Sequence, residues 1–417
     1  MSPLRHLNFR WLLAGELISN FGDGIFLVAL PWYVLAHHGG ALLLGTVLTA
    51  YGLPRTALLV VGGHASDRYQ PWSVMLAANC VRGLAVTAFA VAAATGTAHG
   101  AVLTVIAIVL GAGEGMFVPA SSAIVPALVP SDELQSGNAL VSGTTQLSQL
   151  AGPAIGGLLV AALGPTLGFA IDAATFAVSA LTLAGITRST RRPLATTKAE
   201  GQTGPTATLR HLLAQPIVRL ILVTDALINL GSTGMGRVAL PALARGPLHL
   251  SASGYGVLSA AMGAGLLLGT IAASSMPQAR RPFFVSTLVL LPTVPLIAAL
   301  PYAGGLLITV VIMIPAFILI AIGNLLLLTG FQQWAPPELL GRLTGVLMLA
   351  SIGMMPVSTL VAGLVIGLVG PTAYFPLDAV TLATAAIAQL ASGTWRGFQP
   401  NRRSPPDPQP QLTTANQ

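Results

Sequence analysis

Charged side chains are scarce in this sequence. Asp, Glu, Lys and Arg together make up 7% of its 417 residues, 54% are hydrophobic, and the mean hydropathy is +0.79. A soluble globular domain carries about 25% charged residues, because its surface must face water. A chain this poor in charge cannot cover a water-facing surface of its own size. The composition therefore excludes a soluble domain and predicts an integral membrane protein.

Cysteines, catalytic motifs and basic clusters are also missing. The single cysteine, Cys80, excludes an intrachain disulfide and a cysteine-based metal site. The sequence shows no nucleophile elbow, phosphate-binding glycine loop or zinc spacing, so we expect no enzyme, cofactor, metal or ATP site. Active transport would then depend on an ion gradient. The net charge is +7, but the basic residues stand one or two at a time at helix ends, which argues against a nucleic acid partner.

Long apolar runs fill most of the chain. A membrane-spanning helix needs about 20 mainly apolar residues, and windows of that length predict an all-α fold with twelve transmembrane helices. They are expected at 9–36, 42–64, 72–95, 100–122, 137–163, 165–186, 216–242, 253–276, 282–301, 303–329, 342–369 and 371–392. The first run is too long for a signal-peptide core, so we interpret it as a retained helix.

The arginines predict the orientation. If the N-terminus is cytoplasmic, 15 of the 19 Lys and Arg fall on the cytoplasmic side and only Arg245 falls outside. The other three, Arg55, Arg82 and Arg237, lie within predicted helices. One missed helix would invert every later loop, so this bias predicts a multi-pass protein of the inner membrane with both termini in the cytoplasm.

The longest polar connection divides the chain. It spans 188–215 and separates an N-terminal six-helix bundle (1–187) from a C-terminal six-helix bundle (216–392). The last residues, 393–417, are rich in Pro and Gln, which predicts a disordered cytoplasmic tail.

The two halves repeat each other. GPTLGFAIDAAT begins at Gly164 and GPTAYFPLDAVT begins at Gly370, an offset of 206 that pairs Asp172 with Asp378. The same offset pairs Gly157 with Gly363. Two related bundles of six helices are the organisation of major facilitator superfamily (MFS) transporters, whose halves rock around a site near the membrane midplane.

Acidic residues inside the predicted helices are the first candidates for function, since a charge at mid-membrane costs at least about 2.5 kcal/mol. Glu16, Asn20 and Asp23 share one face of the first helix, because they are spaced four and three residues apart. Such a stripe should face a cavity rather than lipid. Glu16 or Asp23 is then a candidate to bind a proton or a cationic substrate. Alternatively, Asp23 is a hydrogen-bonded packing or gating element.

Glu114 stands between glycines in GAGEGMF on the fourth helix. Glycines cannot shield a carboxylate from lipid, so Glu114 must face protein or water, as a proton carrier would. An ion pair with Arg82 or Arg55 is the competing interpretation.

Asp225, Asn229 and Arg237 form a second polar stripe, on the seventh helix. Under two-fold pseudosymmetry this helix corresponds to the first, so the two stripes could converge on a central cavity. The alternative is a gate contact on the outer side, which suits Arg237 better than substrate binding does. We interpret Asp172 and Asp378 as structural, because the sixth and twelfth helices are peripheral in such an architecture.

Two motifs resemble signatures of the MFS transporters. The loop after the second helix, GHASDRYQP, matches the superfamily's loop signature at Gly63, Asp67 and Arg68, but carries Gln70 and Pro71 where basic residues are usual. Asp67 there could latch the inner gate against a helix N-terminus of the other half.

The fifth helix carries the second motif, QLAGPAIGGLL. Its Gly152, Pro153, Gly156 and Gly157 resemble the signature of the exporter branch of MFS antiporters. Glycines there allow close helix packing, and the proline bends the helix.

Two longer segments, FRWLLAGELISNFGDGIFL and VPASSAIVPALVPSDELQSGNAL, resemble the drug:proton antiporter branch of macrolide-efflux and enterobactin-exporter type proteins. Ser121 departs from that branch, which often has Arg at this position. The resemblance spans 8–392 and implies proton-driven efflux of a hydrophobic or amphiphilic small molecule by a monomer in the lipid bilayer. A proton-coupled importer and a non-transporting membrane receptor are the alternatives, and the glycine-proline motif argues against import.

Overall fold

The computed structural model describes residues 3–37, 39–186, 215–277, 279–335 and 337–393, with side chains from 343 onward in the last range. In this part of the chain, twelve helical segments are long and apolar enough to cross a membrane, and there is no strand. The predicted all-α fold with twelve transmembrane helices is confirmed.

Six spans come from each half of the chain. The first six are α1 (Leu7–Ala36), α2 (Gly40–Tyr69), α3 (Pro71–Ala94), α4 (Gly100–Leu128), α5 (Leu134–Leu163) and α6 (Pro165–Ala184). The seventh is broken into α8 (Pro216–Gly234), the π-helical turn η4 (Met235–Ala239) and α9 (Leu240–Arg245). The others are α10 (Ala252–Ser274), α11 (Pro282–Leu290) continued by α12 (Thr293–Ala299), α13 (Leu306–Trp334), α14 (Pro337–Val369) and α15 (Tyr374–Ala391).

The repeated GPT sequences form the tight turns that follow α5 and α14. Gly164 has φ 82° and Gly370 has φ 105°, a backbone region that L side chains rarely adopt. Each glycine is followed by a proline at the first position of the next helix, where the missing N–H costs nothing. The repeat thus preserves two helix reversals.

One predicted boundary is wrong. The GHASDRY segment was expected in a loop, but α2 continues through it to Tyr69, so Gly63, Asp67 and Arg68 lie in the last turns of that helix. No helix breaker stands between Gly63 and Tyr69, and the Ser66 hydroxyl donates to the Gly62 carbonyl 2.8 Å away. The helix ends at Gln70, whose φ is 69°.

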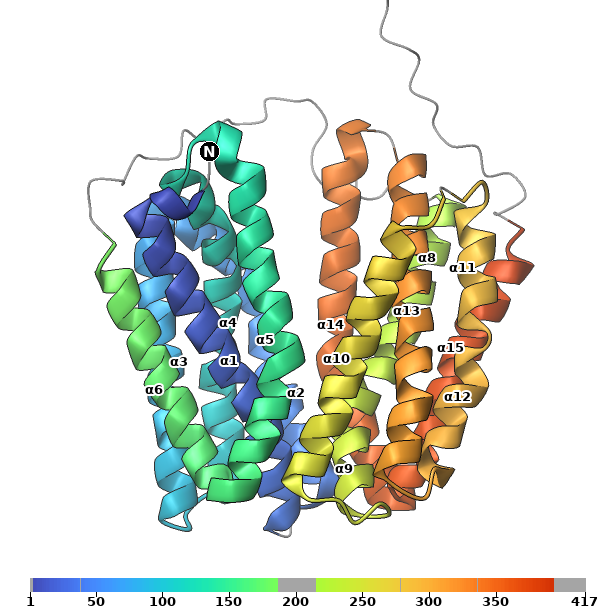
Figure 1. Cartoon of the computed structure of the whole chain (residues 1–417), viewed down its shortest axis with the longest axis horizontal. Helices are drawn as coiled ribbons and strands as arrows, with labels where there is room; N and C mark the ends of the chain where they lie inside the picture. The colour runs from blue at the N-terminus through green and yellow to red at the C-terminus, as the bar shows by residue number, and fades with distance from the viewer. Residues whose placement is uncertain (1–2, 38, 187–214, 278, 336, 394–417) are drawn as a thin grey trace, which may run out of the picture.

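Each half packs as its own bundle (Figure 1). Within the first, α1 packs on α5 and α6, and α4 packs on α2 and α3. Within the second, α8 packs on α14 and α15, and α13 packs on α10 and α11. The halves contact each other mainly through α2 with α14 and α5 with α10. The predicted linker (188–215) and tail (393–417) lie almost entirely outside the described residues.

Two glycine contacts join the halves at one end of the molecule, which we call the closed end. A Cβ on Gly45 of α2 would lie 2.8 Å from the Cα of Gly363 of α14. A Cβ on Gly157 of α5 would lie 2.7 Å from the Cα of Gly256 of α10. The two backbones touch at both places, and pseudosymmetry relates the two contacts.

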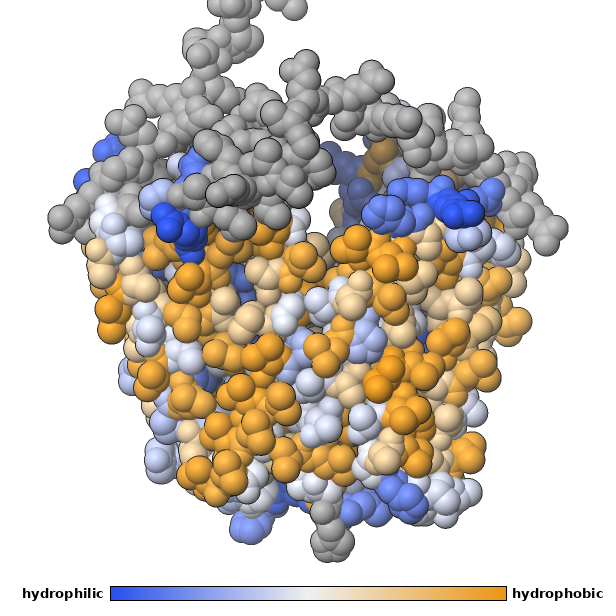
Figure 2. All heavy atoms as spheres, turned by 180° about the vertical axis from the view of Figure 1, so that it is seen from behind, coloured by the Kyte–Doolittle hydropathy of each residue, from blue (hydrophilic) through white to orange (hydrophobic). Residues whose placement is uncertain are grey.

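The halves separate toward the opposite end, where α1 begins, and we call this the open end (Figure 1). Figure 2 shows the molecule hollowed between the halves there. In the same view apolar residues cover the sides of the molecule and hydrophilic residues gather at the two ends. Leucines such as Leu84, Leu307 and Leu368 are more than two-thirds exposed (72%, 75% and 84%). This surface suits lipid contact.

Asp172 and Asp378 hold the peripheral helices in place. Both are fully buried, and each accepts a hydrogen bond from the threonine three residues later, at 3.3 Å and 3.5 Å. A Cβ on Gly22 of α1 would overlap Asp172, and a Cβ on Gly231 of α8 would overlap Asp378. The two aspartates occupy equivalent packing sites, in agreement with their structural interpretation.

Candidate transport site

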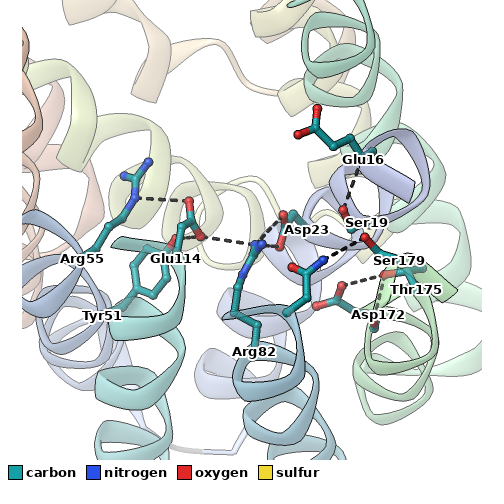
Figure 3. Close-up of polar contacts among 11 residues, drawn as sticks. Glu16, Ser19, Asp23, Tyr51, Arg55, Arg82, Glu114, Asp172, Thr175 and Ser179 are labelled. Atoms are coloured by element: carbon teal, nitrogen blue, oxygen red, sulfur yellow. Dashed lines mark hydrogen bonds and ion pairs between the residues drawn. The ribbon is translucent and has the colours of Figure 1, made fainter. Parts of the chain in front are cut away.

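Arg82 of α3 is the centre of an ion-pair network inside the N-terminal half (Figure 3). Its Nη2 donates to both carboxylate oxygens of Asp23, at 2.9 Å and 2.8 Å, and to Glu114 Oε2 at 3.4 Å. The guanidinium also lies over the rings of Phe117 and Phe176, 5.2 Å and 4.4 Å from their centroids. Its side chain is 3% exposed, so its charge is neutralised by these acids and not by water.

Glu114 of α4 receives a second arginine. Arg55 Nε lies 3.2 Å from Glu114 Oε1, and the Tyr51 hydroxyl donates to the other carboxylate oxygen. The glycines beside Glu114 make room for these neighbours. A Cβ on Gly113 would lie 2.8 Å from Cγ of Arg82, and one on Gly115 would lie 2.5 Å from the carbonyl oxygen of Arg55. Glu114 thus forms ion pairs with both Arg82 and Arg55, as the alternative to a proton carrier predicted.

The network faces the space between the halves. The Asp23 side chain is 39% exposed although Asp23 lies near the middle of α1, and those of Glu114 and Arg55 are 19% and 21% exposed. Figure 3 shows Arg55, Glu114, Arg82 and Asp23 in one row, with Asp172 of α6 apart from it. Arg55 also reaches the other half, because its Nη1 donates to Sδ of Met355 at 3.4 Å.

Glu16 has a different environment from Asp23. It lies two turns closer to the open end of α1, it is 4% exposed, and its carboxylate accepts a hydrogen bond from the Ser121 hydroxyl of α4. It forms no ion pair with any residue that the structure describes. Asn20, one turn further along α1, is partly exposed.

Asp225 of α8 is the counterpart of Glu16 in the second half. Its Oδ2 accepts from Ser351 Oγ of α14 at 2.5 Å, and its Oδ1 accepts from Asn229 Nδ2 at 3.2 Å. Among the described residues it too has only uncharged hydrogen-bond partners.

A repeat that sequence inspection missed relates these carboxylates. An offset of 209 pairs Glu16 with Asp225 and Asn20 with Asn229. It also pairs Gly22 with Gly231, the glycines that contact Asp172 and Asp378. A helix-by-helix comparison would have found it, because its offset differs from the 206 that relates the later helices.

Arg237 lies in η4, where a π-helical turn interrupts the seventh span. The turn is stabilised from neighbouring helices. Ser358 Oγ donates to the Leu230 carbonyl at 2.6 Å and accepts from the Gly234 amide at 2.7 Å, and the Tyr374 hydroxyl donates to the same carbonyl at 3.0 Å. The extra residue of a π turn changes the helix face, so Arg237 is not in the regular register of Asp225 and Asn229.

The predicted motif residues have two different surroundings. Asp67 and Arg68 are exposed at the open end, and a Cβ on Gly63 would meet nothing within 4 Å. The fifth-helix motif is buried: a Cβ on Gly152 would lie 3.0 Å from the Cα of Gly24, and one on Gly156 would lie 2.8 Å from the Cα of Ile25. Gly152 and Gly156 therefore allow α5 to pack closely against α1. Gly157, four residues after Pro153, instead contacts Gly256 of the other half.

The sequence pattern of the Major Facilitator Superfamily matches residues 12–356. The chain belongs to this superfamily. It is a multi-pass membrane transporter and not an enzyme. The enterobactin exporter EntS of Salmonella typhi is 29% identical over 353 residues, which cover 82% of this chain and 81% of the exporter. The resemblance drawn from the sequence is confirmed.

Solved MFS structures share the fold. The nucleoside transporter NupG superposes with a TM-score of 0.76 at 13% identity, over 92% of this chain and 98% of NupG. A bacterial homologue of the iron transporter ferroportin, in an inward-facing state, superposes with a TM-score of 0.70 at 16% identity, over 95% of this chain and 99% of that homologue.

Proposed function

We propose that this MFS transporter exports an amphiphilic small molecule across the cytoplasmic membrane, and that proton influx drives the export. Its similarity to an enterobactin exporter and the glycine-proline motif of α5 support export, and the similarity makes siderophores the first substrates to test. With both termini in the cytoplasm, the open end faces the cytoplasm, and this conformation is ready to load substrate.

Glu16 is the observation that carries the proposal. A carboxylate that is 4% exposed, with a serine hydroxyl as its hydrogen-bond donor and no described cation beside it, is costly to keep ionised inside a membrane. Asp23 and Glu114 are neutralised by arginines and do not need a proton for this purpose. Glu16 therefore binds the coupling proton, and Asp225 provides an equivalent carboxyl in the other half.

The transport cycle follows from this assignment. Protonation of Glu16 from outside favours reorientation toward the cytoplasm, where the proton leaves and a substrate molecule binds. The protein requires neither ATP nor a cofactor in this cycle, and each monomer is a complete transporter.

Inverted membrane vesicles test the proposal. Cells with and without the gene are first compared on a panel of catecholate siderophores, macrolides and amphiphilic dyes. The compound that shows protection is then followed into inverted vesicles with an acidic lumen. We expect accumulation that disappears when the pH gradient is collapsed; accumulation that persists would exclude proton coupling.

A pair of variants locates the proton site. Glu16→Gln should abolish accumulation driven by the gradient while substrate exchange without a gradient continues, because glutamine mimics the protonated carboxyl. Asp132→Asn, which removes an exposed acid just before α5, is the control and should retain both activities. If Glu16→Gln still accumulates substrate in response to the gradient, the proton binds elsewhere.

A further inference from the structure

The charges at the middle of the membrane do not balance. Arg55 and Arg82 neutralise Asp23 and Glu114, and Arg237 adds a third cation from the other half. Asp172 is fully buried and forms no ion pair with a described residue, so we count it as protonated. Three positive and two negative charges then leave one positive charge. A cation without an anion is costly at this depth. The excess charge therefore calls for a negative partner that the described residues do not supply.

Arg237 is the cation left over. It forms no ion pair with any described residue, whereas Arg82 binds two carboxylates and Arg55 binds one. It lies within electrostatic range of Glu114, Arg55, Tyr51 and Tyr255. Glu114 is already paired with two arginines and cannot neutralise a third.

The remaining acids of the transport path are too far away. Asp225 lies twelve residues before Arg237 on the same span, about 18 Å along a helix at 1.5 Å per residue. Glu16 lies seven residues before Asp23 in α1, about 10 Å closer to the open end. Neither can pair directly with Arg237 in this conformation.

Apolar and aromatic side chains lie near Arg237, in addition to the charged groups already named. A Cβ on the neighbouring Gly236 would lie 3.6 Å from Sδ of Met262 in α10. Tyr255 of the same helix stacks on Trp32 of α1, with ring centroids 6.5 Å apart and an angle of 11° between the planes. Arg237 itself is partly exposed, on the side of the molecule where the halves meet. A ligand here would meet the Arg237 cation near the aromatic pair Tyr255 and Trp32.

We propose that Arg237 is an anion-binding residue, and that the transported molecule is an organic anion whose acidic group pairs with Arg237 while its apolar body lies against the aromatic pair Tyr255 and Trp32. This proposal deepens the proposed function and rests on it. The guanidinium is a suitable group, because it can bind a carboxylate, sulfonate or phosphate through two parallel hydrogen bonds. The anion cancels the excess charge, so substrate binding stabilises the centre of the protein.

Two fluorescent probes with one scaffold test the proposal. 1-Anilinonaphthalene-8-sulfonate is an anion, and N-phenyl-1-naphthylamine is the same molecule without the sulfonate. Their binding is titrated by fluorescence on the purified full chain in nanodiscs, with empty nanodiscs as the blank. Loss of a charge-assisted hydrogen bond weakens binding by about ten- to hundredfold.

We expect Arg237→Gln to weaken binding of the sulfonate probe by that factor and to leave the neutral probe unchanged, while Arg237→Lys keeps part of the affinity. Arg219→Gln is the matched control. It removes an exposed arginine of α8 from the same span, near its start and away from the aromatic pair Tyr255 and Trp32. It should affect neither probe.

Equal binding of the two probes by the wild type, or an equal effect of Arg237→Gln on both, would overturn the anion site. Arg237→Lys serves if the glutamine variant does not fold. Proton-driven transport of a neutral compound with no sulfonate preference would refute this inference and leave the proposed function intact. A clear sulfonate preference without proton-driven transport would support the anion site and refute the proposed proton coupling.

Discussion

The contact between Gly157 and Gly256 should decide which end of the transporter is open. A Cβ on Gly157 would lie 2.7 Å from the Cα of Gly256 and 2.9 Å from the carbonyl oxygen of Ala252. Carbon atoms in contact are normally about 3.5–4.0 Å apart, so even a methyl group requires the helices to separate by about 1 Å. Gly157→Val adds two more methyl groups at the same place. The closed end must open to accommodate them.

The magnitude follows from the cost of overpacking. Forcing extra methyl groups into a packed contact costs about 1–3 kcal/mol, which changes a conformational equilibrium about 5- to 150-fold. Suppose that the conformation in which the two halves separate at the closed end is populated at about 1% in the wild type. Gly157→Val should then raise the population of that conformation to between about 5% and 60%.

Spin-label distances measure this shift. Cys80 is replaced by serine, and cysteines are introduced at Leu163 and Tyr302, exposed residues at the closed end of the two halves. We expect a second, longer distance in Gly157→Val. Gly143→Val, on the same helix, is the control, because a Cβ there meets nothing within 4 Å. An unchanged distance distribution in Gly157→Val, or the same change in the control, would refute the reasoning.

Two further substitutions test the supports of the site. Arg82→Ala leaves two acids without their shared cation and should destabilise the fold by about 3–5 kcal/mol, whereas the double variant with Asp23→Asn should recover part of the loss. Thermal unfolding followed by size exclusion compares the stability of the single and double variants. An equal loss of stability in the two variants would count against the ion pair. Ser358→Ala removes the side chain that bonds both Leu230 and Gly234 at the start of the π turn. It should lower the unfolding temperature and weaken binding of the sulfonate probe to Arg237 by severalfold, and a wild-type affinity would show that the turn does not position that arginine.

The number of helices and the location of the buried charges could be predicted from the sequence, because both depend on local composition. Which charges pair could not. The ion pair between Asp23 and Arg82 depends on how α1 and α3 rotate about their axes, and a single helix carries no information on this rotation. In the sequence, Ser121 stands out only as a departure from the usual arginine. In the structure, its hydroxyl donates the hydrogen bond that Glu16 accepts.

The interruption of the seventh span also escaped prediction, for a different reason. Gly234, Gly236 and Pro241 stand at or beside residues 235–239 but do not by themselves specify a π turn. The turn is stabilised by Ser358 and Tyr374, more than a hundred residues away in the sequence. Extrapolating a regular helix from Asp225 placed Arg237 on the face of Asn229. Hydrogen bonds from other helices override the local period there.

The location of the ion-pair network within one half has an electrical consequence. Asp23, Arg55, Arg82 and Glu114 all belong to α1–α4 and sum to zero charge. Rocking of the halves therefore moves the network as a neutral body, and the membrane potential does little work on it. One elementary charge crossing 100 mV corresponds to about 2.3 kcal/mol. Voltage should then act on the charges outside the network, which change when Glu16 gains a proton or Arg237 gains an anion.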